Sequence, residues 1–163
     1  MRVALGGWVH RSRNLGGIVF LDLRDRAGLV QLSFGTDWAS ADVIAAAAAV
    51  GVESVVMIEG TVVERSAATK NAAMGTGDVE VRATNLRVVG PAVTPAIPVA
   101  LGKGEKLPAE ELRLRHRYLD LRRADLQDNR ILRHRLLQTT RQFLSDRGFL
   151  ERETPSLTKP TPE

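Results

Sequence analysis

The sequence has no cysteine and few aromatic residues, and these shortages exclude several kinds of site. Without cysteine there are no disulfide bridges and no thiolate metal centres. The three histidines, His10, His116 and His134, stand far apart in the sequence without metal-ligand spacing. We therefore expect no metal site.

Long hydrophobic runs are also missing. No apolar run is long enough to span a bilayer, and Met1 is followed by no signal-peptide pattern. We expect a cytoplasmic protein without a membrane partner.

The composition that is present fits a folded, basic protein. Hydrophobic residues make up 44% of 163 residues, enough for one full domain or for one small domain plus part of another. The formal net charge is +4 and the isoelectric point is about 10.1. This charge is consistent with a polyanionic partner, although it would equally serve to solvate a small domain.

Residues 18–34 (IVFLDLRDRAGLVQLSF) predict a β-hairpin around which the other segments are arranged. Two apolar runs flank the short polar turn at residues 25–28. Successive side chains of a strand point to opposite faces, so each run has one core-facing set. The core-facing residues are then the following: Val19, Leu21, Leu23, Val30, Leu32 and Phe34.

The same alternation puts Phe20 on the opposite, open face of the hairpin, beside Asp22 and Arg24. Gln31 and Ser33 point outward from the second strand. An aromatic ring among basic and hydrogen-bonding groups on an open sheet can serve as a platform for an unstacked base. The alternative is that Phe20 packs under a loop or against another domain.

The other segments of the first ninety residues predict three more strands and one helix. The strand-like segments are residues 2–13, 53–65 and 78–89. Asp37 is a candidate N-cap for a helix over residues 38–50, whose alanine run favours helix. The Gly6-Gly7 pair suggests a bulge in the first strand.

Taken in order, these elements are three strands, a helix and two strands, the order of an OB-fold, a small five-stranded Greek-key barrel. OB-folds bind oligonucleotides across the second and third strands and the loops beside them. Here that face carries Phe20 and Gln31. The flanking loops carry polar residues that surface solvation would explain equally well: Arg11, Arg13, Arg65 and Asn71.

After Gly90 the composition changes twice, which predicts a linker over residues 91–108 and the start of a second domain over residues 109–163. The linker begins with three prolines, and the segment after it is highly charged and helical. Gly148 is well placed to end the long helix, and residues 149–154 suggest a strand. One helix and one strand are not a domain, so we expect the second unit to be truncated.

Four segments carry a resemblance to a known family: Gly7-Trp8-Val9 with Arg11 and Arg13, then FLDLRDRAGLVQ (20–31), RYLDLRR (117–123) and GFLERETPSLTKPTPE (148–163). Together they resemble bacterial aspartyl-tRNA synthetases, which are class II enzymes. Lysyl-tRNA synthetases share the RYLDL core but generally lack the following Arg-Arg and the LTKPTPE ending. Asparaginyl enzymes also diverge in that ending.

The resemblance implies that the OB-fold, residues 1–90, grips the anticodon of tRNA-Asp, with Phe20 stacking on its central base. Positions matching Arg13, Gln31, Arg65 and Asn71 lie near the anticodon in this family. Leu15 and Lys70 lie in the two loops that decide whether tRNA-Asn is charged as well.

The resemblance also implies roles for the C-terminal part. The long helix and the strand after it look like class II motif 1, which forms a homodimer interface. The residues of this motif are Leu132, Leu136, Phe143 and Pro155. Glu163 matches a glutamate that closes over the amino group of bound aspartate.

No catalytic residue and no cofactor are expected in this stretch. Motifs 2 and 3, which hold ATP and aspartate, would follow Glu163, so ATP and magnesium are expected for the full-length parent. We expect the chain alone to be unable to form aspartyl-adenylate. The alternative reading is a free-standing OB-fold that binds RNA or single-stranded DNA.

Overall fold

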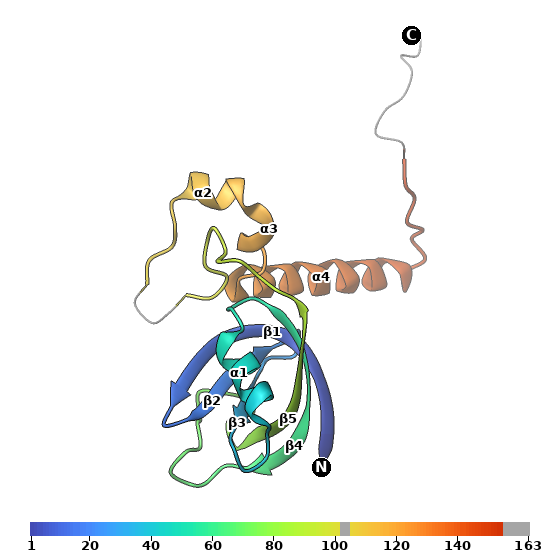
Figure 1. Ribbon diagram of the computed structural model, residues 1–163. Coiled ribbons are helices and arrows are strands. Elements are labelled where there is room, and N and C mark those ends of the chain that lie inside the picture. Colours follow the sequence, from blue (N-terminus) through green and yellow to red (C-terminus); the bar gives the residue numbers. More distant parts are fainter. Residues whose placement is uncertain (102–104, 155–163) are drawn as a thin grey trace, which may run out of the picture. The chain divides into compact units, whose positions relative to one another are not determined.

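The computed structural model describes residues 1–101 and 105–154 (Figure 1). The chain forms two compact units, Met1–Ala96 and Ile97–Glu163. The domain boundaries expected from the sequence stay predictions. In the described part of the chain, no helix is both long and apolar enough to cross a membrane.

The first unit is a five-stranded barrel with one helix (Figure 1). Its elements are β1 (Arg2–Leu15), β2 (Ile18–Arg24), β3 (Leu29–Phe34), α1 (Ala41–Ala49), β4 (Val55–Glu64) and β5 (Val79–Gly90). The barrel closes in the order β1-β2-β3-β5-β4. Strands β3 and β5 are parallel, and all other neighbours are antiparallel. The predicted OB-fold is confirmed.

Burial confirms that apolar residues predicted to face inward from β2 and β3 lie in the core. Leu21, Leu32 and Phe34 are fully buried, and Val19 and Leu23 are at most 3% exposed. They share one core with residues of the other strands and of α1: Val9, Ala47, Val56, Ile58, Val81 and Ala83. This core fixes the register, because a shift by one residue would turn every apolar side chain outward.

The predicted bulge at Gly6-Gly7 is wrong. β1 pairs regularly with β4 from Arg2 to Trp8, and its register against β2 shifts between Val9 and Arg11 instead. Gly7 is required for a different reason, since a Cβ there would lie 2.5 Å from the carbonyl oxygen of Arg24. The glycine permits a close approach of two strands.

The predicted helix start is also wrong, because Ser40 rather than Asp37 is the N-cap of α1. The Ser40 hydroxyl accepts a hydrogen bond from the Val43 N–H at 3.4 Å. Trp38 lies before the helix in a turn, where its N–H bonds to the Gly35 carbonyl at 3.2 Å. Its indole Nε1 donates to the Ser33 carbonyl at 2.9 Å, which ties the turn to β3.

The second unit contains α2 (Glu110–Arg115), α3 (Arg117–Asp120) and α4 (Ala124–Ser145). Gly148, at φ 83°, follows α4, as predicted for the residue that ends the helix. The strand predicted at residues 149–154 is wrong, because these residues form no regular element in the structure. Pro155 and Glu163 lie outside the described residues.

A buried carboxylate organises the start of the second unit. Asp120 is fully buried and accepts hydrogen bonds from Arg113 Nε at 3.0 Å, Arg117 Nη1 at 2.8 Å and Arg123 Nη1 at 3.0 Å. The hydrogen bond from Arg113, followed by the charges of the three arginines, holds the pKa of Asp120 below its ordinary value. The RYLDLRR segment therefore closes on itself through its aspartate.

Candidate nucleic-acid interface

Four strands place one residue each in a single row across the outer face of the barrel. Arg13 of β1 is the register partner of Phe20 on β2, and Phe20 is the partner of Ser33 on β3. Ser33 is in turn the partner of Arg82 on β5. The row thus carries an aromatic ring and a hydroxyl between two arginines.

Phe20 projects outward from β2, as the alternation predicts. Its side chain is half-buried, and the guanidinium carbon of Arg13 lies 6.0 Å from the ring centroid. This distance is within the range of a cation–π contact. The ring is therefore steadied from the β1 side.

Ser33 of this row and two residues beside it, Asp22 and Gln31, are polar but covered, so the expectation of a fully open face is wrong. Asp22, Gln31 and Ser33 are 9%, 6% and 1% exposed. Arg13 Nη2 donates to Asp22 Oδ1 at 2.6 Å and to Gln31 Oε1 at 3.2 Å. Glu80 accepts from Gln31 Nε2 at 2.9 Å and from Ser33 Oγ at 3.1 Å.

This network holds the Gln31 amide by both of its ends. Its oxygen accepts from Arg13, and its nitrogen donates to Glu80. A base that hydrogen-bonds to Gln31 must share or displace one of these partners, so the site has a set orientation before any ligand arrives.

Arg65 carries polar atoms that are buried without a partner. Its Nε and Nη1 are buried and make no hydrogen bond to any described residue. An unpaired buried donor is costly, and a ligand that accepts from it recovers that cost. Arg13 Nε is in the same condition.

The loop between β4 and β5 contains two further predicted residues, Lys70 and Asn71. Lys70 Nζ pairs with Glu64 at 2.9 Å and with Asp78 at 3.5 Å. The hydrogen bond to Glu64 is the main reason that the pKa of Lys70 is raised. The Asn71 side chain accepts from the Ala73 N–H at 3.1 Å, so it shapes the loop.

Arg11 and Leu15 are exposed residues of β1. Leu15 is 62% exposed and precedes a two-residue turn, Gly16-Gly17, in which both glycines have positive φ. Neither side chain takes part in the network around Gln31 among the contacts that the structure shows.

The structure also brings residues to this face that the sequence did not single out: Trp38, Glu80 and Arg82. Because they are two residues apart on a strand, Glu80 and Arg82 share one side of β5. Only the parallel pairing of β3 with β5 places that side next to Gln31 and Ser33.

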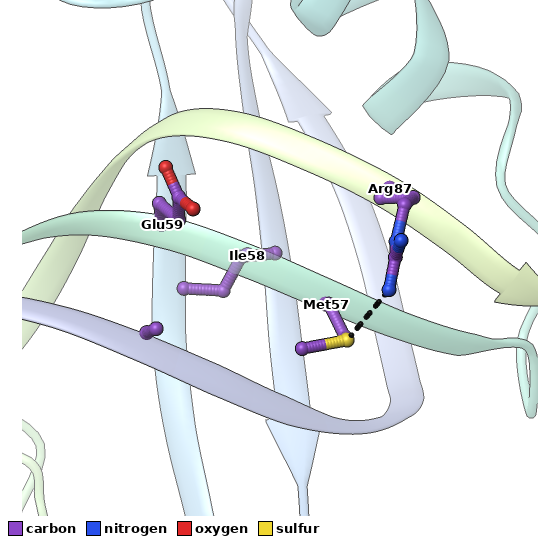
Figure 2. A pocket seen from close by; sticks show the side chains of 5 residues that line it. Met57, Ile58, Glu59 and Arg87 are labelled. Carbon is purple, nitrogen blue, oxygen red and sulfur yellow. Dashed lines mark hydrogen bonds between the residues drawn. The ribbon is translucent and has the colours of Figure 1, made fainter.

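A depression elsewhere on the barrel lacks comparable chemistry (Figure 2). It is lined by Ala4, Met57, Ile58, Glu59 and Arg87, and Arg87 Nη2 lies 3.2 Å from Met57 Sδ. It contains neither an aromatic ring nor a nucleophile. The row through Phe20 is therefore the better candidate for a ligand.

On the second unit, three of the four residues predicted for motif 1 lie on the surface of α4. Leu132, Leu136 and Phe143 are 66%, 64% and 51% exposed. No residue of this 22-residue helix is buried in the described structure. An apolar stripe of this kind is typical of an interaction surface.

Residues 3–89 match the family described as "OB-fold nucleic acid binding domain". The chain belongs to this OB-fold family. Residues 109–163 match a second family, described as "tRNA synthetases class II (D, K and N)". The outward row described above thus lies on an OB-fold of the nucleic-acid-binding type.

Comparison with individual proteins confirms the resemblance to bacterial aspartyl-tRNA synthetases. The OB-fold chain is 50% identical over 161 residues to an aspartate–tRNA(Asp/Asn) ligase of Lachnoclostridium phytofermentans, covering 99% of this chain and 26% of that protein. It is 46% identical over 162 residues to an aspartate–tRNA ligase of Agathobacter rectalis, again covering 99% and 26%. It spans about a quarter of the length of these curated relatives.

Among solved structures, an asparaginyl-tRNA synthetase from Pyrococcus horikoshii is similar with a TM-score of 0.81 and 26% sequence identity. The match covers 97% of this chain and 35% of that one. The fold of the OB-fold chain is therefore shared with this class of synthetases.

Proposed function

We propose that the barrel binds the anticodon loop of tRNA-Asp and that the protein to which this stretch corresponds is an aspartate–tRNA ligase of the cytoplasm. The observation that carries the proposal is the 50% identity over 99% of the chain to such a ligase. The row of Arg13, Phe20, Ser33 and Arg82 supports it, because it combines a stacking surface with positive charge.

In this proposal each predicted residue has a physical task. Phe20 stacks on a base, and Gln31, held by Arg13 and Glu80, presents a fixed amide to a base edge. Arg65 offers its unpaired donors to the RNA. Arg11 and Asn71 contact the loop at its margins, and Leu15 and Lys70 bear on the choice between tRNA-Asp and tRNA-Asn.

The proposal extends to the second unit. In the whole protein, the exposed stripe of α4 with Leu132, Leu136 and Phe143 contributes to a homodimer interface, and the predicted motif 1 residue Pro155 is assigned to the same interface. In the whole enzyme, the task of Glu163 is to bind the amino group of the aspartate substrate. The whole enzyme uses ATP and magnesium to activate aspartate, but among residues 1–101 and 105–154 no group of three acidic or histidine side chains could hold a metal.

The test is a binding titration of the chain with a hairpin RNA whose loop presents the aspartate anticodon. Phe20→Ala should weaken binding by about 1–3 kcal/mol, the usual worth of a base–aromatic stack. The melting temperature should change little, because Phe20 faces outward. Phe149→Ala is the matched control, since Phe149 is an exposed aromatic of the second unit, 63% exposed, and should change neither quantity.

Two results would contradict the proposal. A large loss of melting temperature with unchanged RNA affinity would mean that Phe20 serves the fold. Equal binding of a hairpin with a scrambled loop, or of single-stranded DNA, would favour a general single-strand binder.

A further inference from the structure

The β5 end of the row carries a stacked pair, Arg82 on Trp38, that none of the predicted roles uses. The guanidinium carbon of Arg82 lies 4.8 Å from the Trp38 ring centroid. Both side chains lie at the outer face, with Trp38 half-buried and Arg82 exposed. Such a distance is typical of a cation–π contact, and tryptophan is the best aromatic partner for it.

The indole beneath Arg82 is held in place from two sides. Its Nε1 donates to the Ser33 carbonyl at 2.9 Å. Its ring lies against Gly35, where an added Cβ would come within 2.7 Å of the ring atoms. Because the platform is fixed, the guanidinium on it loses less freedom on binding a ligand than a free arginine would.

The charges around Arg82 leave it uncompensated. At the other end of the row, Arg13 is paired with Asp22 at 2.6 Å. Glu80, the outward carboxylate nearest to Arg82 along β5, accepts hydrogen bonds from Gln31 and Ser33. Arg82 itself forms no ion pair with any residue that the structure describes.

We propose that Arg82, stacked on Trp38, binds a phosphate group of the nucleotide strand whose base stacks on Phe20. The inference rests on the proposed function and adds a contact to the same face. Arg82 stands two strands from Phe20 through Ser33, roughly 10 Å at the usual strand spacing. A neighbouring nucleotide of one strand fits across this interval.

A phosphate suits this site better than a base does. Trp38 covers one face of the Arg82 guanidinium, so the N–H edge of the guanidinium remains available for a ligand. Two N–H groups on that edge can bind a phosphate in bidentate fashion. The contact positions the strand and carries no sequence information of its own.

The test compares Arg82→Gln with Arg82→Lys in the full 163-residue chain, using the anticodon hairpin over a series of salt concentrations. Removing the charge should weaken binding about tenfold, the lower range for a hydrogen bond to a charged group. The slope of log K against log salt should become shallower by about 0.7, the value for one phosphate of a single strand. Arg82→Lys keeps the charge and should keep the slope.

Arg87→Gln is the matched control. Arg87 is an exposed arginine of the same strand, but it contacts Met57 at the depression of Figure 2. It should leave affinity and slope unchanged. Melting temperatures of all variants show whether the barrel is folded.

The inference is overturned if Arg82→Gln weakens binding with an unchanged salt slope, or if Arg87→Gln has the same effect as Arg82→Gln. If Arg82→Gln does not fold, the test rests on Arg82→Lys, which keeps the charge. The inference is overturned if the salt slope of this variant is shallower than that of the wild-type chain by about 0.7. A failure of the proposed function gives a different result. The wild-type chain would then bind scrambled and anticodon loops equally, while Arg82→Gln would still make the salt slope shallower.

Discussion

The two units of this chain differ in the interactions that stabilise each of them internally. The barrel has a continuous apolar core to which all five strands and α1 contribute. In the described part of the second unit, the buried apolar cluster consists of three side chains, Ile97, Val99 and Leu119, and beside it is the buried carboxylate of Asp120 with its arginines. Burial of apolar side chains stabilises the first unit, whereas ion pairs to a buried carboxylate contribute much of the stability of the second.

The barrel covers its own apolar residues, whereas α4 leaves its apolar stripe exposed. A closed barrel satisfies its backbone hydrogen bonds and covers its apolar face by itself. The helix α4 buries none of its residues in the described structure, so its apolar stripe needs a further surface to cover it.

The largest difference should come from the same substitution made in each unit. Leu21→Ala in the barrel core should destabilise the chain by about 2–5 kcal/mol, since a cavity replaces a fully buried side chain. Leu136→Ala on α4, where the side chain is 64% exposed, should stay within about 0.5 kcal/mol. Denaturant unfolding measures both, and equal losses would refute the contrast.

A second prediction concerns the ionic centre. Asp120→Asn should loosen residues 105–147 without changing the melting of the barrel, because three arginines lose their shared carboxylate. Hydrogen exchange resolved along the chain measures this. Asp128→Asn is the control, since this exposed carboxylate of α4 makes no hydrogen bond or ion pair with any residue that the structure describes and should have little effect.

The same centre predicts an acid response. The pKa of Asp120 is lowered in the folded chain, so its contribution to stability is present above the ordinary value of 3.8 and is lost as the pH falls below it. Protection of the second unit that persists unchanged at pH 2 would speak against the role of Asp120.

The smallest effect should appear in the barrel at His10. Burial, and then the charge of Arg24, lower the pKa of His10 from 6.5, while Asp22 and Glu53 act in the opposite direction. The unfolded chain therefore binds the proton more readily, and barrel stability should decline as the pH falls below about 6.5. His10→Gln should reduce this decline in melts between pH 7.5 and 5.5. An identical slope in the variant would exclude His10 as its source.

Much of the barrel could be predicted because its strands obey a two-residue period. Leu21, Leu32 and Phe34 had to face inward, and Phe20 had to face outward. What alternation cannot show is which strands meet. The parallel pairing of β3 with β5 places Glu80 and Arg82 beside Gln31, which is buried there. No local sequence pattern predicts this pairing.

The errors have local causes of the same kind. Asp37 satisfied the rule for an N-cap, but the bond from Trp38 to Ser33 holds that segment as a turn. Gly7 resembled a bulge residue, but a glycine is needed there because the backbone of Arg24 lies too close for a Cβ. Leu15 and Lys70 were singled out by the resemblance alone, and the roles of all the predicted site residues stay predictions.

The long strand β1 has a consequence for the order in which the barrel folds. Its first half pairs with β4, as Val3 does with Gly60, and its second half pairs with β2, as Asn14 does with Val19. The second pairing closes a tight hairpin, whereas the first joins segments that are distant in the chain and carries a larger loop-closure entropy. We therefore expect the β1–β2–β3 meander to form early and the β1–β4 seam to close late, so that the rate of folding is set by ring closure.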